Sequence, residues 1–186
     1  EDFAKMDIGR KLRRGIPEVV FAEKKEFLDL KKIILATLSR ADSVLVSRIH
    51  KNYYKKILDF SRKNKLKIKT GKNSTSILFF KKLSSTGGKV GILTAGTSDV
   101  GVAEEARLMC EAMGCQCICS YDVGIAGIHR LFPIVKKMIQ ADVDAIIVVA
   151  GMEGALASII SSLVDIPVIG VPSSVGYGYG EKGVAA

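Results

Sequence analysis

The feature that most constrains the fold of this chain is a regular alternation of segments in its second half. Short apolar runs, typical of strands covered on both faces, alternate with longer runs whose apolar residues recur at helical spacing. This alternation predicts a parallel sheet covered by helices. The expected strands are residues 89–95, 116–121, 145–150 and 168–171, and the expected helices are residues 102–113, 127–140 and 154–163.

Residues with useful chemistry follow each of these expected strands. Ligands of open α/β sheets bind outside the carboxyl ends of the strands, so we expect these residues to gather at one edge and to form a substrate site. In chain order they are Gly96, Thr97, Ser98 and Asp99, then Asp122 and His129, then Glu153, and finally Ser173, Ser174, Gly176 and Tyr177.

The loop of residues 96–99 has the composition of an anion-binding turn. Gly96 allows a sharp turn, Thr97 and Ser98 offer hydroxyls, and the start of a helix supplies unpaired amides and a favourable dipole. The loop matches neither a Walker loop nor a G-x-G-x-x-G fingerprint. We interpret it as a grip for phosphate or ribose; the alternative is an ordinary turn in which Asp99 only caps the helix.

Three residues of this edge are candidate catalytic residues: Asp99, His129 and Glu153. A neutral histidine can carry protons. Glu153 stands between two glycines after the most apolar strand, where its charge is costly unless it meets a helix N-terminus, a metal or a substrate. The alternatives are a surface histidine and a capping glutamate. Residues 172–180 are rich in hydroxyls and glycine, which favours a mobile lid.

The charge distribution divides the chain near Lys89. Residues 1–88 hold 22 Lys and Arg against 9 Asp and Glu, a net charge of +13, whereas the rest holds 6 against 10, a net charge of −4. We therefore expect a small basic α+β domain at 1–82, a linker at 83–88 and an α/β domain at 89–186. The first domain should contain strands at 17–22, 43–49, 65–70 and 76–80 and helices at 25–39 and 52–64.

The basic half does not favour nucleic acid as a partner, because its lysines are scattered and it has no arginine-rich tract or zinc-finger spacing. The four cysteines, at positions 110, 115, 117 and 119, fit neither a disulfide nor a zinc site and are expected to be reduced packing residues, as in a cytoplasmic protein. The most apolar run, residues 145–152, is too short to cross a bilayer, so no membrane association is expected.

Four segments of the second half, in order, resemble the AIR carboxylase superfamily of purine biosynthesis. More closely they resemble its LarB branch, which makes the nickel-pincer nucleotide cofactor. These segments are Ala-Gly-Thr-Ser-Asp at 95–99, Tyr-Asp-Val-Gly-Ile-Ala-Gly-Ile-His-Arg at 121–130, Gly-Met-Glu-Gly-Ala-Leu at 151–156 and Pro-Ser-Ser-Val-Gly-Tyr-Gly at 172–178. Residues 2–7 and 15–21 resemble the N-terminal module of the same branch.

The resemblance implies a flavodoxin-like three-layer parallel sheet preceded by a small α+β domain. It implies an enzyme that adds carbon dioxide to the pyridinium ring of nicotinic acid adenine dinucleotide and, with Mg²⁺, cleaves the phosphoanhydride to release AMP. In that family a cysteine thiolate first adds to the electron-poor ring and makes it nucleophilic. The resemblance also implies a homo-oligomer.

The sequence departs from the family where that cysteine should be. The reactive cysteine of the family lies beyond the Gly-Tyr-Gly loop, and none of the four cysteines here aligns with it. A fifth sheet strand and a helix are expected there too, so we expect the sequence to be part of a longer protein; the alternative is an inactive form of the enzyme. Two alternatives remain: an aminoimidazole ribonucleotide carboxylase or mutase, and a non-catalytic module that binds a nucleotide or RNA, the latter with affinity that falls steeply with salt.

Overall fold

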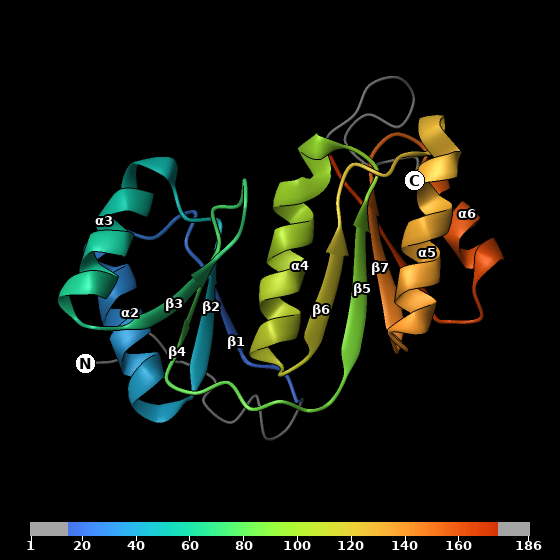
Figure 1. Cartoon of the computed structure of the whole chain (residues 1–186). Coiled ribbons are helices and arrows are strands. Elements are labelled where there is room, and N and C mark those ends of the chain that lie inside the picture. Colours follow the sequence, from blue (N-terminus) through green and yellow to red (C-terminus); the bar gives the residue numbers. More distant parts are fainter. Residues whose placement is uncertain (1–14, 175–186) are drawn as a thin grey trace. The chain divides into compact units, whose positions relative to one another are not determined.

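The computed structural model describes residues 15–174 of the chain, which group into two compact units (Figure 1). The first unit contains the residues up to Thr86 together with Leu108–Gly114. The second contains Gly87–Arg107 and the residues from Cys115 onward. The expected domains of residues 1–82 and 89–186, with a linker at 83–88, stay a prediction.

The first unit is built on a four-stranded mixed sheet. Its strands lie in the order β1-β2-β4-β3; β1 and β2 are parallel, and β4 is antiparallel to both β2 and β3. The unit therefore has the expected α+β composition. Its elements are β1 (Glu18–Phe21), α2 (Phe27–Arg40), β2 (Ser43–Ser47), α3 (Lys51–Lys63), β3 (Lys67–Thr70) and β4 (Ile77–Phe80).

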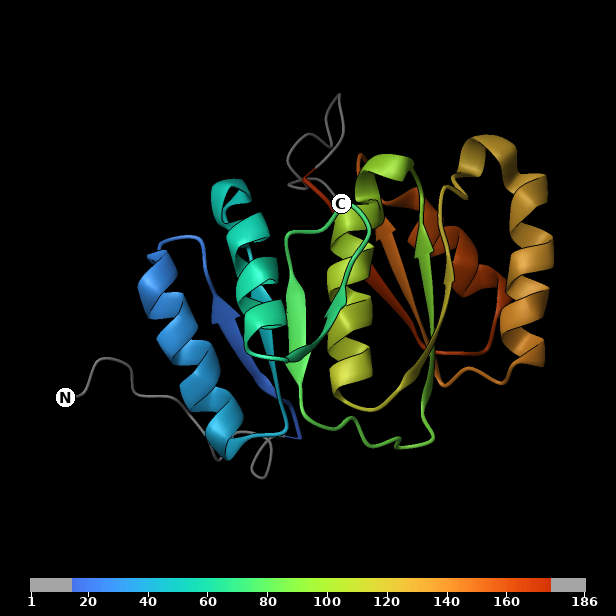
Figure 2. The ribbon, with the colours of Figure 1, turned by 60° about the vertical axis from the view of Figure 1, so that its left-hand side comes forward.

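Helices α2 and α3 lie side by side on one face of this sheet (Figure 2). Their apolar faces meet the sheet in a core that includes Leu30, Ile34, Ile57 and Phe79. Burial of each such side chain contributes roughly 1.5–3 kcal/mol. Strand β2 ends at Ser47, two residues before the expected end at residue 49, because Arg48 has a φ of +55° and turns the chain away from the sheet.

The second unit is built on a four-stranded sheet in which every neighbouring pair is parallel, in the order β6-β5-β7-β8. This confirms the parallel sheet predicted from the alternation of segments. The elements are β5 (Lys89–Thr94), α4 (Val100–Ala112), β6 (Gln116–Ser120), α5 (Leu131–Gln140), β7 (Ala145–Ala150), α6 (Ala155–Leu163) and β8 (Val168–Pro172).

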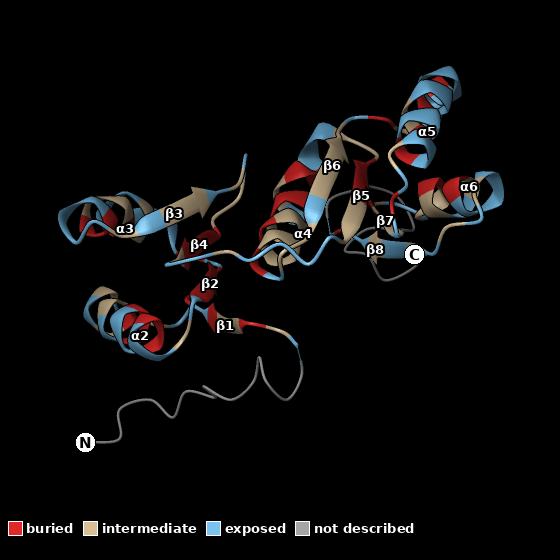
Figure 3. Ribbon diagram, turned by 60° about the horizontal axis from the view of Figure 1, so that its bottom comes forward, coloured by how far each residue is buried: buried red, intermediate tan, exposed pale blue. Residues whose placement is uncertain are grey.

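Helices cover both faces of this parallel sheet. Helix α4 lies on one face, and α5 and α6 lie on the other (Figure 1). The central strands β5 and β7 are largely buried, whereas much of α5 and α6 faces solvent (Figure 3). Ile146 and Val148 of β7 pack into the core beneath α5 and α6, and Val149 packs with Ala103 of α4. The flavodoxin-like three-layer arrangement is thereby confirmed.

The chain differs from expectation just before α5. The expected helix of residues 127–140 begins at Leu131, and the preceding residues form a separate 3-10 helix, η2 (Ile125–Arg130). Gly127, with φ −129° and ψ 59°, interrupts helical geometry inside η2. His129 and Arg130 therefore belong to an irregular turn, and not to the start of a long helix. In the loop between β5 and α4, a short 3-10 helix, η1 (Thr97–Asp99), precedes α4.

Within the described part of the chain, none of the helices combines the length and the apolar character needed to cross a membrane. The expected cytoplasmic location and the expected homo-oligomer stay predictions.

Candidate active site

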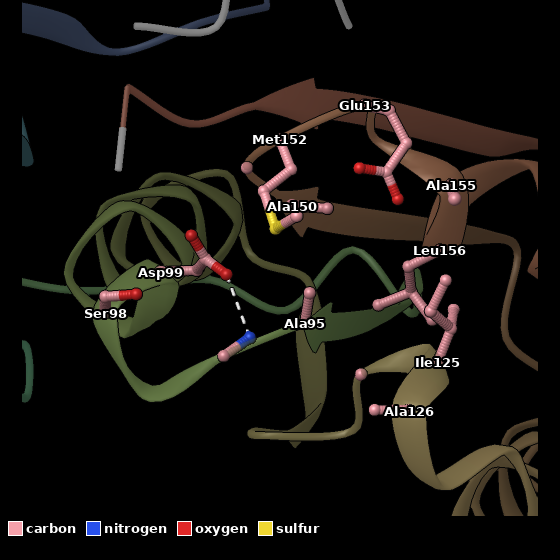
Figure 4. A pocket seen from close by; sticks show the side chains of 13 residues that line it. Ala95, Ser98, Asp99, Ile125, Ala126, Ala150, Met152, Glu153, Ala155 and Leu156 are labelled. Atoms are coloured by element: carbon pink, nitrogen blue, oxygen red, sulfur yellow. Dashed lines mark hydrogen bonds between the residues drawn. The ribbon is translucent and has the colours of Figure 1, made fainter. Parts of the chain in front are cut away.

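The loops at the carboxyl edge of the parallel sheet enclose a cavity of about 550 Å³. The loops that follow β5, β6 and β7 line it, as Figure 4 shows. The lining is mostly apolar, with two carboxylates and one hydroxyl among its side chains. The lining residues are Ala95, Gly96, Ser98, Asp99, Gly124, Ile125, Ala126, Ala150, Gly151, Met152, Glu153, Ala155 and Leu156.

Asp99 is buried at the end of η1, and both of its carboxylate oxygens accept hydrogen bonds. Its Oδ2 accepts from the backbone N–H of Gly96 at 2.9 Å (dashed in Figure 4), which closes the loop on itself. Its Oδ1 accepts from the Ser173 hydroxyl at 2.6 Å, so the loop after β5 is joined to the residue that follows β8. Bonds to a charged acceptor are the stronger kind, and two of them hold this carboxylate in place.

Thr94, the last residue of β5, fixes the neighbouring loop. Its Oγ1 accepts a hydrogen bond from the backbone N–H of Asp122 at 3.0 Å, and its carbonyl accepts from the N–H of Val123 at 2.9 Å. Sequence reasoning missed this residue. The available signal was a hydroxyl at the end of an otherwise apolar strand, which a fully buried position tolerates only when the hydroxyl has a partner.

Close backbone approach also shapes the cavity wall. A Cβ on Gly124 would lie 2.7 Å from the carbonyl oxygen of Ala95, so only glycine lets the loop after β6 close onto the end of β5. In the loop after β7, Met152, which lines the cavity, and Gly154 have φ values of +57° and +69°. A methionine in this left-handed region carries backbone strain of the kind that accumulates at functional sites.

Glu153 lines the cavity from the loop after β7, and its side chain is exposed. Figure 4 shows it on the opposite side of the cavity from Ser98 and Asp99. Within residues 15–174, the structure gives its carboxylate neither a hydrogen bond nor an ion pair. The burial cost that the sequence suggested is therefore avoided by exposure, and the carboxylate is available to a ligand.

The structure brings only some of the predicted residues into the cavity. Gly96, Ser98, Asp99 and Glu153 line it, and Ser173 reaches it indirectly through its bond to Asp99. The others that the structure describes are exposed and are not among the lining residues; they are Thr97, Asp122, His129 and Ser174. Gly176 and Tyr177 lie outside the described residues.

The apolar wall of the cavity was not anticipated. Ile125 of η2, Met152 of the loop after β7 and Leu156 of α6 line one cavity. Each looks like an ordinary packing residue in the sequence, yet Ile125 and Met152 are 40% and 37% exposed. An apolar surface that stays open beside a few polar groups is typical of a small-molecule site.

The described residues contain no group of three or more His, Cys, Asp or Glu side chains able to surround a metal ion by themselves. Mg²⁺ does not require such a cage, because it is commonly held by one or two carboxylates together with substrate phosphates and water. Glu153 fits that arrangement, since its carboxylate is exposed at the cavity. Asp99 fits it less well, since both of its oxygens already accept hydrogen bonds.

Comparisons with known proteins agree with this architecture. Residues 1–73 match the LarB/PurE-like N-terminal domain, and residues 89–184 match AIR carboxylase. An uncharacterized protein of Methanocaldococcus jannaschii is 50% identical over 183 residues, which cover 96% of this chain and 71% of the relative. The N5-carboxyaminoimidazole ribonucleotide mutase of Pyrococcus horikoshii is 36% identical over 87 residues, which cover 45% of this chain and 47% of that enzyme.

The AIR carboxylase match extends over almost all of the parallel-sheet unit, including the loops that line the cavity. The LarB/PurE-like N-terminal match covers the strands and helices of the basic unit through β3. On these two matches, the chain belongs to the AIR carboxylase superfamily, in its LarB-like branch.

Proposed function

We propose that the protein carboxylates the pyridinium ring of nicotinic acid adenine dinucleotide and hydrolyses its phosphoanhydride, releasing AMP, as the first step of nickel-pincer nucleotide synthesis. The observation that carries the proposal is the pairing of a LarB-type N-terminal domain with an AIR carboxylase domain, a pair that belongs to enzymes of the carboxylase and mutase class. In the reaction, carbon dioxide forms one bond to a ring carbon, that carbon loses its proton, and water cleaves the phosphoanhydride into two phosphate monoesters.

The cavity supports this proposal through its two unlike walls. Ser98 and the amide groups around η1 form a polar wall at the start of α4, where a phosphate would be favoured. The apolar wall of Ile125, Met152 and Leu156 suits the flat ring of a nicotinate. A ligand with an anionic end and an aromatic end would meet both walls.

Proton handling would fall to the loop after β6 and the loop after β7. We assign removal of the ring proton to His129, which stands in η2 four residues after Ile125 of the cavity wall. Thr97, Asp122, Ser174, Gly176 and Tyr177 stay predicted substrate contacts. For the exposed residues among them, the proposal requires that the bound dinucleotide extend beyond the cavity over the rim of the sheet.

Glu153 would hold Mg²⁺ together with the diphosphate of the substrate. When bound there, the ion would neutralise the negative charge that builds up as the phosphoanhydride is cleaved. The role of Glu153 is to fix one side of the diphosphate across the cavity from Ser98, so that water can approach the bond in line.

The ring-activating thiolate does not come from the cavity lining described here. Cys115, Cys117 and Cys119 are at or on β6, and none of the four cysteines lines the cavity. The M. jannaschii relative is longer, since the matched region covers 71% of it. In the proposed function the thiolate is supplied by a cysteine outside residues 1–186, as the family resemblance implies.

The test is turnover by the full-length protein. Incubation with nicotinic acid adenine dinucleotide, Mg²⁺ and ¹³C-bicarbonate should yield AMP and a carboxylated mononucleotide that carries the label, both detected by mass spectrometry. Omission of Mg²⁺ should abolish AMP release. Absence of labelled product with the dinucleotide, under conditions in which the folded protein binds it, would overturn the proposal.

A second candidate is an aminoimidazole ribonucleotide carboxylase or mutase. It is favoured by the 36% identity to the P. horikoshii mutase. The same assay distinguishes the two functions: turnover of the imidazole ribotide without turnover of the dinucleotide would establish the second. A non-catalytic binding module predicts no turnover of either substrate, together with RNA affinity that falls steeply as salt rises.

A further inference from the structure

We propose that Tyr121 is a positioning residue, which acts through a hydrogen bond to Glu104 to set the loop that forms one wall of the cavity and carries His129. Neither residue lines the cavity, and neither was among the predicted site residues. The kinetic part of this inference rests on the proposed function, whereas its structural part does not.

The contact belongs to a partly buried ionic cluster between α4 and the end of β6. Glu104 is 5% exposed. Its Oε2 accepts hydrogen bonds from Nε and Nη2 of Arg107, at 2.9 and 2.6 Å, and its Oε1 accepts from the Tyr121 hydroxyl at 2.6 Å. One carboxylate oxygen thus faces a cation and the other faces a phenol, an arrangement of strong and directional bonds.

Stability alone does not account for such a cluster. Removing charges from water is costly, and apolar residues of similar volume commonly stabilise a fold as well as a buried ion pair does. What the cluster adds is direction, because the hydroxyl of Tyr121 donates specifically to Oε1 of Glu104, while Arg107 donates to Oε2. Burial, together with hydrogen bonds to Cys119 and Glu104, raises the pKa of Tyr121, so the phenol keeps its proton and remains a donor at neutral pH.

Tyr121 lies at the point where the chain leaves β6 and enters the loop that reaches the cavity. It stands between Ser120, where β6 ends, and Asp122, whose φ of +60° starts the loop. Its side chain is anchored to α4, while the next two backbone N–H groups are anchored to Thr94 of β5. The start of the loop is therefore held on two sides, by Glu104 of α4 and by Thr94 of β5.

Four residues beyond Tyr121, the same loop reaches the cavity at Ile125. Arg130, at the far end of η2, donates a hydrogen bond from Nη1 back to the carbonyl of Asp122 at 3.1 Å, which closes the loop on its own first residue. A displacement at Tyr121 would therefore be carried to the cavity wall and to His129.

Hydrogen exchange tests the structural part without any substrate. In Tyr121→Phe, which keeps the ring and loses only the hydroxyl, the amides of residues 122–130 should exchange roughly tenfold faster, while those of residues 150–154 stay unchanged. The matched control is Tyr53→Phe, which removes a tyrosine–glutamate hydrogen bond of 2.9 Å in the other unit. Unchanged exchange at residues 122–130 in a folded Tyr121→Phe variant would overturn the inference.

The acceptor side provides a second, independent pair of variants. Glu104→Gln keeps an oxygen that can accept from Tyr121, so its loop exchange should stay closer to that of the unchanged protein than the loop exchange of Glu104→Leu. Equal exchange in the two variants would contradict a role for the hydrogen bond.

Kinetics separate positioning from simple stabilisation. With the full-length protein and the dinucleotide, Tyr121→Phe should lower kcat roughly tenfold and raise KM by a clearly smaller factor, because the displaced loop carries His129 and only one ring contact, Ile125, while the Ser98 wall does not move. An unchanged kcat in a protein whose loop exchange has increased would refute the effect on chemistry. If the unaltered protein turns over no dinucleotide, the proposed function fails, and the exchange experiment still decides the structural role of Tyr121.

Discussion

The loops after β5 and β7 each bring a carboxylate to the same cavity, and they hold it in opposite ways. Asp99 is 3% exposed and accepts one hydrogen bond on each oxygen. Glu153 is exposed and, in the described part of the chain, has no such partner. A carboxylate with both oxygens engaged fixes backbone, whereas a carboxylate without partners can bind a ligand or an ion. The comparison separates a carboxylate that holds the loops together from one that is open to a ligand.

Asp99→Ala should have the largest effect. It removes the acceptor of two hydrogen bonds, one from the Gly96 N–H and one from the buried Ser173 hydroxyl, and the loss of both should cost about 3 kcal/mol of unfolding free energy. Urea denaturation measures the change, with the exposed Asp165→Ala as the control. A loss below about 1 kcal/mol would mean that Asp99 does not hold the loops together.

Glu153→Gln should separate activity from stability. We expect turnover to fall about 100-fold, equivalent to about 2.7 kcal/mol, because the carboxylate proposed to hold Mg²⁺ loses its charge. Its unfolding free energy should change by less than about 0.5 kcal/mol, since the side chain is exposed. Steady-state assays of the full-length protein measure the first effect and urea denaturation the second. Full activity would remove Glu153 from the proposed chemistry.

Two glycines of the cavity wall offer a matched pair. Gly124→Ala should destabilise the protein by about 2 kcal/mol, because the added Cβ would lie 2.7 Å from the carbonyl oxygen of Ala95. Gly96→Ala is the control: its nearest contacts would be 3.6 Å away, and its φ of −128° suits alanine. Thermal unfolding of the two variants should differ clearly, and equal melting temperatures would argue against a tight closure at Gly124.

Adjacent serines give the smallest expected effect. Ser173→Ala removes one of the two bonds to Asp99 and should cost about 1.5 kcal/mol, because it leaves a buried carboxylate oxygen without its donor. Ser174→Ala changes an exposed side chain and should cost less than about 0.5 kcal/mol. Urea denaturation measures both changes. A larger loss of unfolding free energy in Ser174→Ala than in Ser173→Ala would contradict a stabilising role for the hydrogen bond between Ser173 and Asp99.

The sequence allowed the sheet and the polar edge of the site to be predicted because both depend on local patterns. The run of residues 145–150 matched β7 at both ends, since a buried strand leaves a continuous apolar signal. The loop of residues 96–99 follows β5, where glycine and hydroxyl residues cluster in the sequence, and three of its residues line the cavity; its role in binding a substrate stays a prediction.

The remainder depends on contacts that leave no local trace. The bond between Asp99 and Ser173 joins residues 74 positions apart, and the cavity wall combines Ile125 with Met152 and Leu156. Helix α5 begins later than expected because the backbone at Gly127 leaves helical geometry, which the apolar spacing of residues 127–140 did not indicate. Whether His129 takes part in the chemistry stays a prediction.

The backbone at Met152 has a consequence for engineering. A left-handed residue with a branched or long side chain costs about 1–3 kcal/mol, and glycine relieves most of that cost. Met152→Gly should therefore make the fold more resistant to heat while deleting a thioether from the cavity wall. At this single position, a gain in melting temperature is expected to come with a loss of ligand affinity. Melting curves and binding isotherms of the same variant would measure both changes.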